Sequence, residues 1–137
     1  MRTAVDSSVL LDVLGADPEF GVRSRGALRK AYDSGALVAC DVVWAEVRAH
    51  FPDHASFSKA LGVVGVTFDP LSAETARAAG EMWREYCRRV QRPRSRLVAD
   101  FLVGAHALHQ ADALLCRDRG YYKEDFSGLR LIDPSRE

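Results

Sequence analysis

Short apolar, β-branched runs alternate with longer helical patterns along the whole chain, and this alternation constrains the fold more than any other feature. The first run is TAVD at residues 3–6, and the helical pattern SSVLLDVL follows at residues 7–14. Strands separated by helices of about ten residues or more belong to right-handed βαβ units, whose strands pair in parallel. The sequence therefore predicts an α/β fold with a parallel sheet covered by helices on both faces.

The expected elements follow one another without a domain linker, an internal repeat or a low-complexity tract. The predicted strands are residues 3–6, 36–41, 63–69, 113–116 and 129–133, and the predicted helices are residues 7–14, 21–35, 42–51, 54–62, 71–90 and 96–111. Gly35 closes the second helix, and Ser72 begins a capping pattern at the start of the fifth. Because 137 residues is about the size of one compact domain, we expect a single domain over residues 1–137.

Composition narrows the class of protein. Lys+Arg and Asp+Glu both number 19, so any affinity for nucleic acid or a membrane must come from a local cluster. No apolar run reaches the roughly 18 residues that span a bilayer, and the N-terminus lacks the order of a signal peptide. The three cysteines, Cys40, Cys87 and Cys116, are widely spaced. Free thiols of this kind fit a cytoplasmic protein.

Four acidic residues lie at strand ends or beside the apolar stripes of helices, where acidic surface residues are not usually found. Asp6 ends the first strand, and Asp118 follows the fourth, so both lie at the carboxyl edge of the sheet, where open α/β sheets bind ligands. Glu46 and Asp100 border the apolar stripes of two predicted helices. Acids in such places are costly unless they are paired or bound to a metal.

Each of these acids also has a structural interpretation when taken alone. Asp6 can cap the helix that follows it, and Asp118 can be a turn residue. Asp100 can pair with Arg96 four residues earlier, and Glu46 with a nearby arginine. Taken together, four acids at the helix starts and strand ends of one sheet favour a metal site.

Crowded carboxylates suit a particular chemistry. Like charges within a few Å repel each other and raise each other's pKa values unless a cation neutralises them. Hard oxygen ligands select Mg²⁺ or Mn²⁺ over zinc. A metal held in this way binds phosphate oxygens, activates water and stabilises an in-line displacement at phosphorus. The acids therefore indicate phosphodiester hydrolysis.

The order of these motifs resembles that of a known family. The segments VDSSVLLD, VVWAEV, RLVADFLVGAHAL and LLCRDRGYYKEDFSGLRLIDP resemble, in this order, the PIN-domain ribonucleases. The likeness is strongest to the VapC-like toxins of type II toxin–antitoxin systems, and it covers nearly the whole chain. It implies a three-layer α/β/α sandwich with a central parallel sheet, and a Mg²⁺- or Mn²⁺-dependent endoribonuclease, which is a hydrolase.

The resemblance also implies roles for individual residues. Asp6, Glu46, Asp100 and Asp118 match the family's catalytic acids, and among them Asp6, Asp100 and Asp118 match its metal ligands. Ser7 matches an accessory serine, with Ser8 as a competitor. The family often places a further acid or polar residue soon after the fourth aspartate, whereas Arg119 and Gly120 follow it here. Asp125 is a more distant alternative to Asp118 for completing the site.

The same resemblance implies partners. The family's usual partner is a small VapB-like antitoxin, whose C-terminal segment wraps the toxin and blocks its site. Family members commonly form homodimers, which set two active sites into one groove. The substrate implied is a structured RNA, which the toxin cleaves to inhibit growth.

A cluster of basic residues precedes the Asp100 helix and is a candidate contact for RNA phosphates. It consists of Arg88, Arg89, Arg92, Arg94 and Arg96. The alternative is a solvated helix end, where basic residues favour the helix dipole. A second function hypothesis is a noncatalytic PIN-like module that keeps the fold and uses these arginines to bind RNA or a partner protein. A phosphoaspartate enzyme ranks lower, because Ser8 occupies the position where that chemistry needs a second aspartate.

Three further side chains have structural interpretations. Trp44 and Trp83 are expected in the core or an interface. Asp12, six residues after Asp6, is expected to face solvent.

Overall fold

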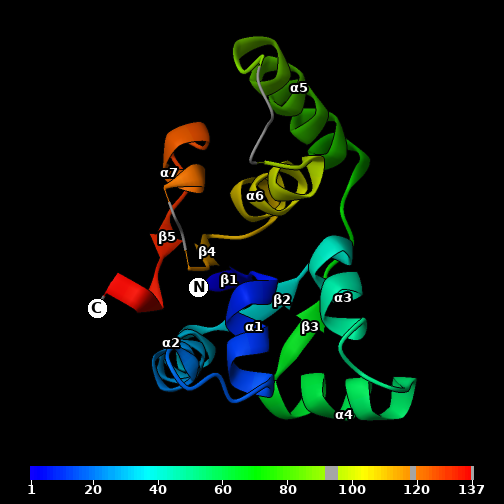
Figure 1. Ribbon diagram of the computed structural model, residues 1–137, viewed down its shortest axis with the longest axis vertical. Coiled ribbons are helices and arrows are strands. Elements are labelled where there is room, and N and C mark those ends of the chain that lie inside the picture. The colour runs from blue at the N-terminus through cyan, green and yellow to red at the C-terminus, as the bar shows by residue number, and fades with distance from the viewer. Residues whose placement is uncertain (92–95, 118–119, 137) are drawn as a thin grey trace.

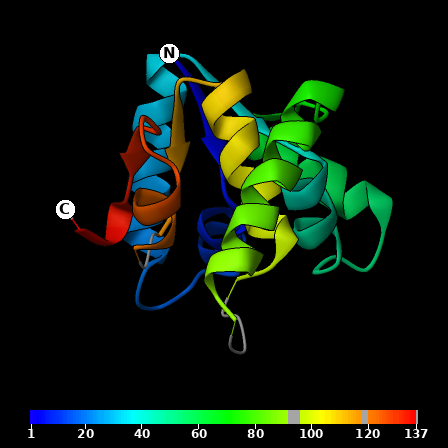
Figure 2. The same ribbon diagram turned by 90° about the horizontal axis from the view of Figure 1, so that it is seen from above.

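The computed structural model describes residues 1–91, 96–117 and 120–136. Its centre is a parallel sheet of five strands in the order β3-β2-β1-β4-β5. The strands are β1 (Arg2–Val5), β2 (Ala36–Ala39), β3 (Val66–Phe68), β4 (Ala113–Leu115) and β5 (Leu131–Ile132). Helices lie on both faces of this sheet (Figures 1 and 2). The predicted α/β fold with a central parallel sheet is confirmed.

The helices divide between the two faces according to the direction in which the chain crosses the sheet. They are α1 (Ser7–Leu14), α2 (Gly21–Ser34), α3 (Asp41–Arg48), α4 (His54–Val64), α5 (Ala73–Arg89), α6 (Val98–Gln110) and α7 (Tyr121–Asp125), followed by the 3-10 turn η1 (Pro134–Arg136). The chain moves outward from β1 to β3 and then crosses back to β4. Because such crossovers are right-handed, this reversal places α5 and α6 on the face opposite α1 and α2 (Figure 1).

Strand β1 is the central strand and determines where the sheet can hold a site. It pairs with β2 through Thr3 and Leu37 and with β4 through Ala4 and Leu114. The strand order reverses between β1 and β4, which is where open α/β sheets form a ligand crevice beyond their carboxyl ends. The amide of Asp6 donates to Leu115 O at 2.9 Å, so the exits of these two strands lie side by side.

The buried side chains form one core on both faces of the sheet. Strands β1 and β4 are almost entirely buried, and Phe101 of α6 is 1% exposed beneath the rings of Trp83 and Tyr86. Cys40 and Cys116 are buried free thiols, as expected from the sequence. None of the helices in the described part of the chain combines the length and hydropathy that crossing a membrane requires.

Several boundaries differ from the sequence prediction. Helix α4 continues through Val64, although residues 63–69 were predicted as a strand, and β3 therefore begins only at Val66. Gly65 explains the difference, because it adopts the left-handed conformation (φ 84°) that ends a helix, and its amide donates to Leu61 O. Helix α7 was not predicted at all.

The expectation that Asp12 faces solvent is wrong. Its side chain is buried, and its carboxylate is paired with Arg117. The tryptophan prediction agrees better with the structure, because Trp44 and Trp83 are partly buried and pack against the core.

Candidate metal and nuclease site

Asp6 stands at the junction of β1 and α1 with its carboxylate available for a ligand. It occupies the position before the first helical residue, yet its side chain forms no capping hydrogen bond. The hydroxyl of Ser8 donates to Asp6 Oδ2 at 2.9 Å. The carboxylate is therefore oriented by the start of α1 without being used as its cap.

Glu46 approaches the same region from α3, on the neighbouring crossover. The hydroxyl of Ser7 donates to Glu46 Oε1 at 3.2 Å, which joins the start of α1 to the exposed face of α3. The two serines after Asp6 thus have separate partners: Ser8 contacts Asp6, and Ser7 contacts Glu46. Ser7, which matches the family's accessory serine, therefore contacts one of the predicted catalytic acids.

Asp100 lies in the first turn of α6 on the opposite face of the sheet. Its Oδ2 accepts a hydrogen bond from the amide of Leu97 at 2.9 Å, which closes the helix start. The pairing of Asp100 with Arg96 that the spacing allowed is not formed. Arg96 instead bonds to Asp125, so the charge of Asp100 is left for other groups.

The electrostatics show that these three carboxylates influence one another. Burial raises the pKa of Asp6, and the nearby charge of Asp100 raises it further, whereas the Ser8 hydroxyl and the amides at the start of α1 lower it. Burial also raises the pKa of Glu46, with added repulsion from Asp6 and Asp100. Burial raises the pKa of the Tyr122 phenol, and the charges of Asp6 and Asp100 contribute. Asp6, Glu46 and Asp100 therefore lie close enough for their charges to interact, and a bound cation would relieve that repulsion.

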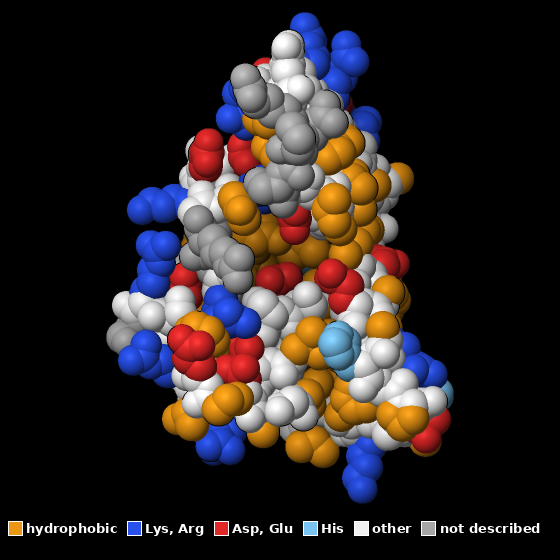
Figure 3. All heavy atoms as spheres, in the orientation of Figure 1, with side chains coloured by type: hydrophobic (Ala, Val, Ile, Leu, Met, Phe, Trp, Pro, Cys, Tyr) orange, Lys and Arg blue, Asp and Glu red, His pale blue; other side chains and the backbone are white. Residues whose placement is uncertain are grey.

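The surface at this point is hollowed. In Figure 3, acidic side chains border a hollow with hydrophobic side chains at its floor, between the part of the molecule that carries α5 and α6 and the part that carries α1 and α3. This position agrees with the crevice expected where the strand order reverses.

Carboxylate oxygens are the kind of ligand that Mg²⁺ and Mn²⁺ prefer. The described carboxylates do not, however, form a complete set of ligands around one metal ion. Over residues 1–91, 96–117 and 120–136, no three His, Cys, Asp or Glu side chains stand where they could hold one metal ion together. Mg²⁺ commonly uses only one or two carboxylates and keeps several waters, so Asp6 and Asp100 fit such a site. Asp118, the fourth predicted acid, lies outside the described residues. Its alternative, Asp125, is already paired with Arg89 and Arg96.

The predicted basic cluster divides in the structure. Arg88 and Arg89, at the end of α5, are exposed, and Arg89 pairs with Asp125 at 2.8 Å. Arg92 and Arg94 lie outside the described residues. Arg96 is 2% exposed, and its guanidinium packs over the rings of Phe101, Tyr121 and Tyr122. It therefore serves the interior of the protein and offers no surface charge.

Sequence reasoning missed a second buried polar cluster next to the site. Asp12 on α1 pairs with Arg117, the residue that precedes Asp118, and also accepts the hydroxyl of Ser24 at 2.8 Å. One sequence feature pointed to this burial: Asp12 follows Val9 by three residues, which places it on the apolar face of α1. Its partner could not be found from spacing, because Arg117 is 105 residues away.

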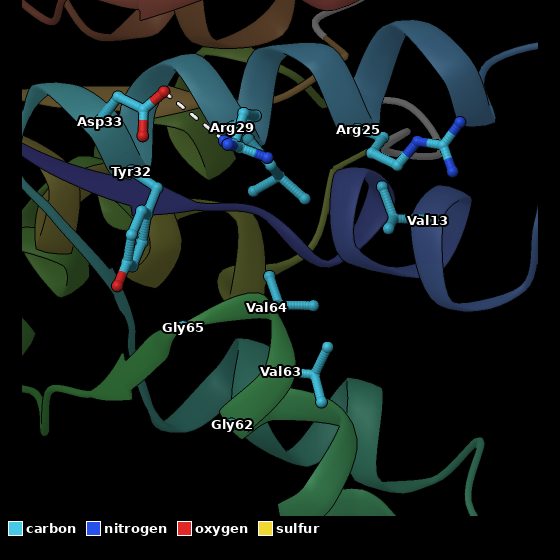
Figure 4. A pocket seen from close by; sticks show the side chains of 10 residues that line it. Val13, Arg25, Arg29, Tyr32, Asp33, Gly62, Val63, Val64 and Gly65 are labelled. Carbon is cyan, nitrogen blue, oxygen red and sulfur yellow. Dashed lines mark ion pairs between the residues drawn. The ribbon is translucent and has the colours of Figure 1, made fainter.

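A separate groove of about 440 Å³ lies between α2 and α4 (Figure 4). Its walls combine apolar side chains, among them Val63 and Tyr32, with the guanidinium groups of Arg25 and Arg29. Val63 is 82% exposed. None of the three acids lines this groove, so it is distinct from the acidic site.

The fold resembles solved toxin structures over nearly the full length of each chain. VapBC2 of Rickettsia felis, bound to a promoter DNA fragment, superposes with a TM-score of 0.70 at 14% identity, covering 97% of this chain and 98% of that one. VapBC-1 of nontypeable Haemophilus influenzae superposes with a TM-score of 0.66 at 14% identity, covering 99% and 100%. VapC20 of Mycobacterium tuberculosis, a toxin that cleaves the sarcin–ricin loop, superposes with a TM-score of 0.58 at 13% identity, covering 90% and 95%.

Sequence comparison gives the family. A search of curated proteins finds no match for this chain. The family model of the PIN domain matches residues 3–126, a range that contains all four predicted acids, Asp6, Glu46, Asp100 and Asp118. The chain therefore belongs to the PIN-domain family.

Proposed function

We propose that this protein is a Mg²⁺- or Mn²⁺-dependent endoribonuclease toxin that a small antitoxin neutralises. The observation that carries the proposal is that Asp6 and Glu46, in a PIN-type fold, each have a pKa raised by burial and by nearby acidic charge, that of Asp100 included. We extend this to one catalytic domain over residues 1–137, acting in the cytoplasm, where its free thiols stay reduced.

The acids have different roles, which follow from their positions. Asp6 and Asp100, with Asp118, hold the metal through carboxylate oxygens. A bound Mg²⁺ or Mn²⁺ supplies charge stabilisation at the phosphoryl oxygens and lowers the pKa of water. Glu46, exposed at the rim and held by the hydroxyl of Ser7, accepts the proton of the attacking water at a carboxylate oxygen. Burial and the neighbouring acids raise the pKa of Glu46, which makes its carboxylate a stronger base.

Exposed arginines beside the site support binding of RNA. Arg88 and Arg89 lie at the end of α5, and Arg92 and Arg94 follow them in sequence. Together they attract a phosphate backbone without reading its sequence. We leave Arg96 out of this group, because its guanidinium is buried against aromatic rings.

The groove between α2 and α4 supports a protein partner. Solved structures with this fold include VapBC, FitAB and other toxin–antitoxin complexes. The groove combines exposed apolar surface at Val63 with the positive charge of Arg25, which forms no ion pair within the described ranges. An amphipathic antitoxin helix with acidic residues beside its apolar face fits this surface. We also propose that the toxin forms a homodimer, which sedimentation measures directly.

The direct test of catalysis replaces the carboxylates that hold the metal. Asp6→Asn and Asp100→Asn should each abolish Mg²⁺-dependent RNA cleavage and growth arrest, with the circular dichroism spectrum unchanged. Glu81→Gln, on the exposed surface of α5, is the matched control and should cleave at the wild-type rate. Cleavage by either site variant at the wild-type rate contradicts the metal-site proposal.

One observation favours a second candidate, a noncatalytic module that binds RNA or protein. Within the described residues the acids do not form a closed set of three metal ligands. Calorimetry with Mn²⁺ separates the two candidates. Binding of Mn²⁺ that disappears in Asp6→Asn supports the nuclease, and the absence of such binding supports the noncatalytic module.

A further inference from the structure

Arg96 is a buried cation that is only partly satisfied by hydrogen bonds. Its side chain is 2% exposed, and its Cζ lies 4.6 Å from the ring centroid of Phe101 and 5.1 Å from that of Tyr121. Nη1 donates to Tyr121 O at 3.0 Å and to the carboxylate of Asp125. Nε and Nη2 have no hydrogen-bond partner within the described part of the chain. The fold therefore holds a buried guanidinium with two unsatisfied nitrogens, which is costly.

Stability alone is a weak reason to keep such an ion pair. Apolar side chains of similar volume often replace a buried ion pair without loss of stability, whereas removal of one partner alone is destabilising. Aromatic rings already surround Arg96, so an apolar side chain would find apolar neighbours there. What the pair adds is direction, because a guanidinium bonds its acceptors with a fixed geometry.

Asp125 joins three helices at this point. It is the last residue of α7, and it pairs with Arg96, which precedes α6, and with Arg89 at the end of α5, 2.8 Å away. The bond from Arg96 to the carbonyl of Tyr121 holds the first residue of α7 as well. The backbone that enters α6 is therefore fixed to α5 and to both ends of α7.

The first turn of α6 carries the carboxylate of Asp100. The amide of Leu97, the residue after Arg96, donates to Asp100 Oδ2 at 2.9 Å, and the amide of Asp100 donates to Leu97 O at 3.0 Å. The orientation of this carboxylate thus depends on the position of Leu97, next to the residue that is anchored. Helix α6 packs against β1, which ends directly before Asp6, and against α3, which carries Glu46. A displacement of the first turn of α6 therefore moves one acid relative to the other two.

We propose that Arg96 is a positioning residue, whose bonds to Asp125 and to Tyr121 O fix the first turn of α6 so that Asp100 can share a metal ion with Asp6. This inference rests on the proposed metal-dependent function. It assigns a role in metal binding to a buried arginine that contacts neither metal nor RNA. This role differs from the phosphate contact that the basic neighbours of Arg96 in the sequence suggested.

The experiment replaces the ion pair with apolar side chains in the full chain and measures Mn²⁺ binding by calorimetry. Arg96→Met combined with Asp125→Leu keeps the net charge and removes both partners of the buried pair. We expect the melting temperature to stay within about 5 °C of wild type, and Mn²⁺ to bind about 10-fold or more weakly, as loss of outer-shell partners commonly causes. The matched control is Arg77→Met with Glu81→Leu, an exposed pair on α5 at 2.8 Å, which should bind Mn²⁺ with wild-type affinity.

Hydrogen exchange separates positioning from a general loosening of the fold. In the double variant the amides of Leu97 and Asp100 should exchange faster, while the amide of Leu114, which bonds to Arg130 O in the sheet, stays protected. Asp125→Asn is the second variant, because it keeps the size of the side chain and removes its charge. It should also weaken Mn²⁺ binding, with Glu81→Gln as its control, and it decides the question alone if the double variant does not fold.

Weaker Mn²⁺ binding with faster exchange at Leu97 and Asp100 supports the inference. Wild-type Mn²⁺ affinity in either folded variant overturns it, and so does equal weakening in the controls. Weaker binding without faster exchange at these amides also overturns it, because the first turn of α6 has then not moved. A wild-type protein that binds no Mn²⁺ overturns the proposed function itself, and the role of Arg96 with it.

Discussion

Gly104 on α6 makes a close contact whose cost can be worked out from the structure. A Cβ atom at this position would lie 2.3 Å from Cζ of Phe126 and 2.6 and 2.7 Å from the two Cε atoms. Carbon atoms in ordinary contact stand about 3.5–4.0 Å apart. In Gly104→Ala the ring of Phe126 must therefore retreat by more than about 1 Å.

The ring has little room to retreat. Phe126 is 2% exposed, its centroid lies 5.9 Å from Phe101 and 5.8 Å from Tyr122, and its amide bonds to the carbonyl of Tyr122. Overpacking of this kind costs about 1–3 kcal/mol. Alanine recovers about 1 kcal/mol through its higher helix propensity. We therefore expect Gly104→Ala to lower the free energy of unfolding by up to about 2 kcal/mol, and to be about 1–3 kcal/mol less stable than the same change at a helical glycine with free space around it.

Urea denaturation measures this change, and Gly80→Ala provides the matched control. Gly80 is also helical, on α5, but a Cβ there meets nothing within 4 Å. The control should gain up to about 1 kcal/mol from helix propensity alone. If Gly104→Ala has the same free energy of unfolding as Gly80→Ala, the ring of Phe126 can move away at no cost. That result refutes the close packing of Phe126, the residue after α7, against Gly104 of α6. If the packing is as described, displacement of α7 also moves Tyr122 beside the acids, and RNA cleavage falls.

Three further predictions follow from the site and its surroundings. The pKa of Asp6 is raised, so the folded protein binds the proton more tightly than the unfolded chain, and this group lowers stability as pH rises above about 3.8. In EDTA, Asp6→Asn should thus be more stable than wild type by about 1–2 kcal/mol at pH 7 and gain nothing near pH 3, in urea denaturation; equal stability at pH 7 would show that burial of the charged carboxylate does not destabilise the fold. Arg96→Met removes the buried one of the two arginines that pair with the partly buried Asp125 and should cost about 3–5 kcal/mol, whereas a loss below about 1 kcal/mol in thermal unfolding would show that this ion pair does not stabilise the fold. Val63→Glu should weaken antitoxin binding at least 10-fold in calorimetry without changing RNA cleavage, and unchanged affinity excludes the groove as the docking surface.

The sequence predicted the parts of this fold that local patterns determine. Apolar runs with an acid or glycine at the end located β1, β2 and β4, and Ser72 marked the start of α5, where its hydroxyl accepts the amide of Thr75. The sequence left open whether Asp6 caps the following helix, and in the structure it occupies the N-cap position without a capping hydrogen bond from its side chain. These features depend on residues that are close in the sequence, so a local sequence pattern is enough to predict them.

Features that depend on distant partners were missed. Helix α7 has only five residues and no apolar periodicity, and it is held by the burial of Tyr122 and by the bond from Arg96 to the carbonyl of Tyr121. Arg96 was assigned to RNA because its neighbours are basic, whereas its carboxylate partner is 29 residues away. Asp12 was expected to face solvent because its partner, Arg117, is 105 residues away in the sequence. Long-range ion pairs decide which charges are buried, and a single sequence does not contain them.

The central position of β1 also determines when the acidic site can exist during synthesis. The amide of Arg2 bonds to the carboxylate of Asp112 across 110 residues of sequence. A ribosome adding about 5–20 residues per second needs about 5–20 s to cover that distance. The nascent chain carries Asp6 through nearly all of that interval, and Glu46 through its later part, without the strand that completes their edge of the sheet. The emerging polypeptide thus has no assembled acidic centre until β4 has been translated, which leaves time for a partner to bind first.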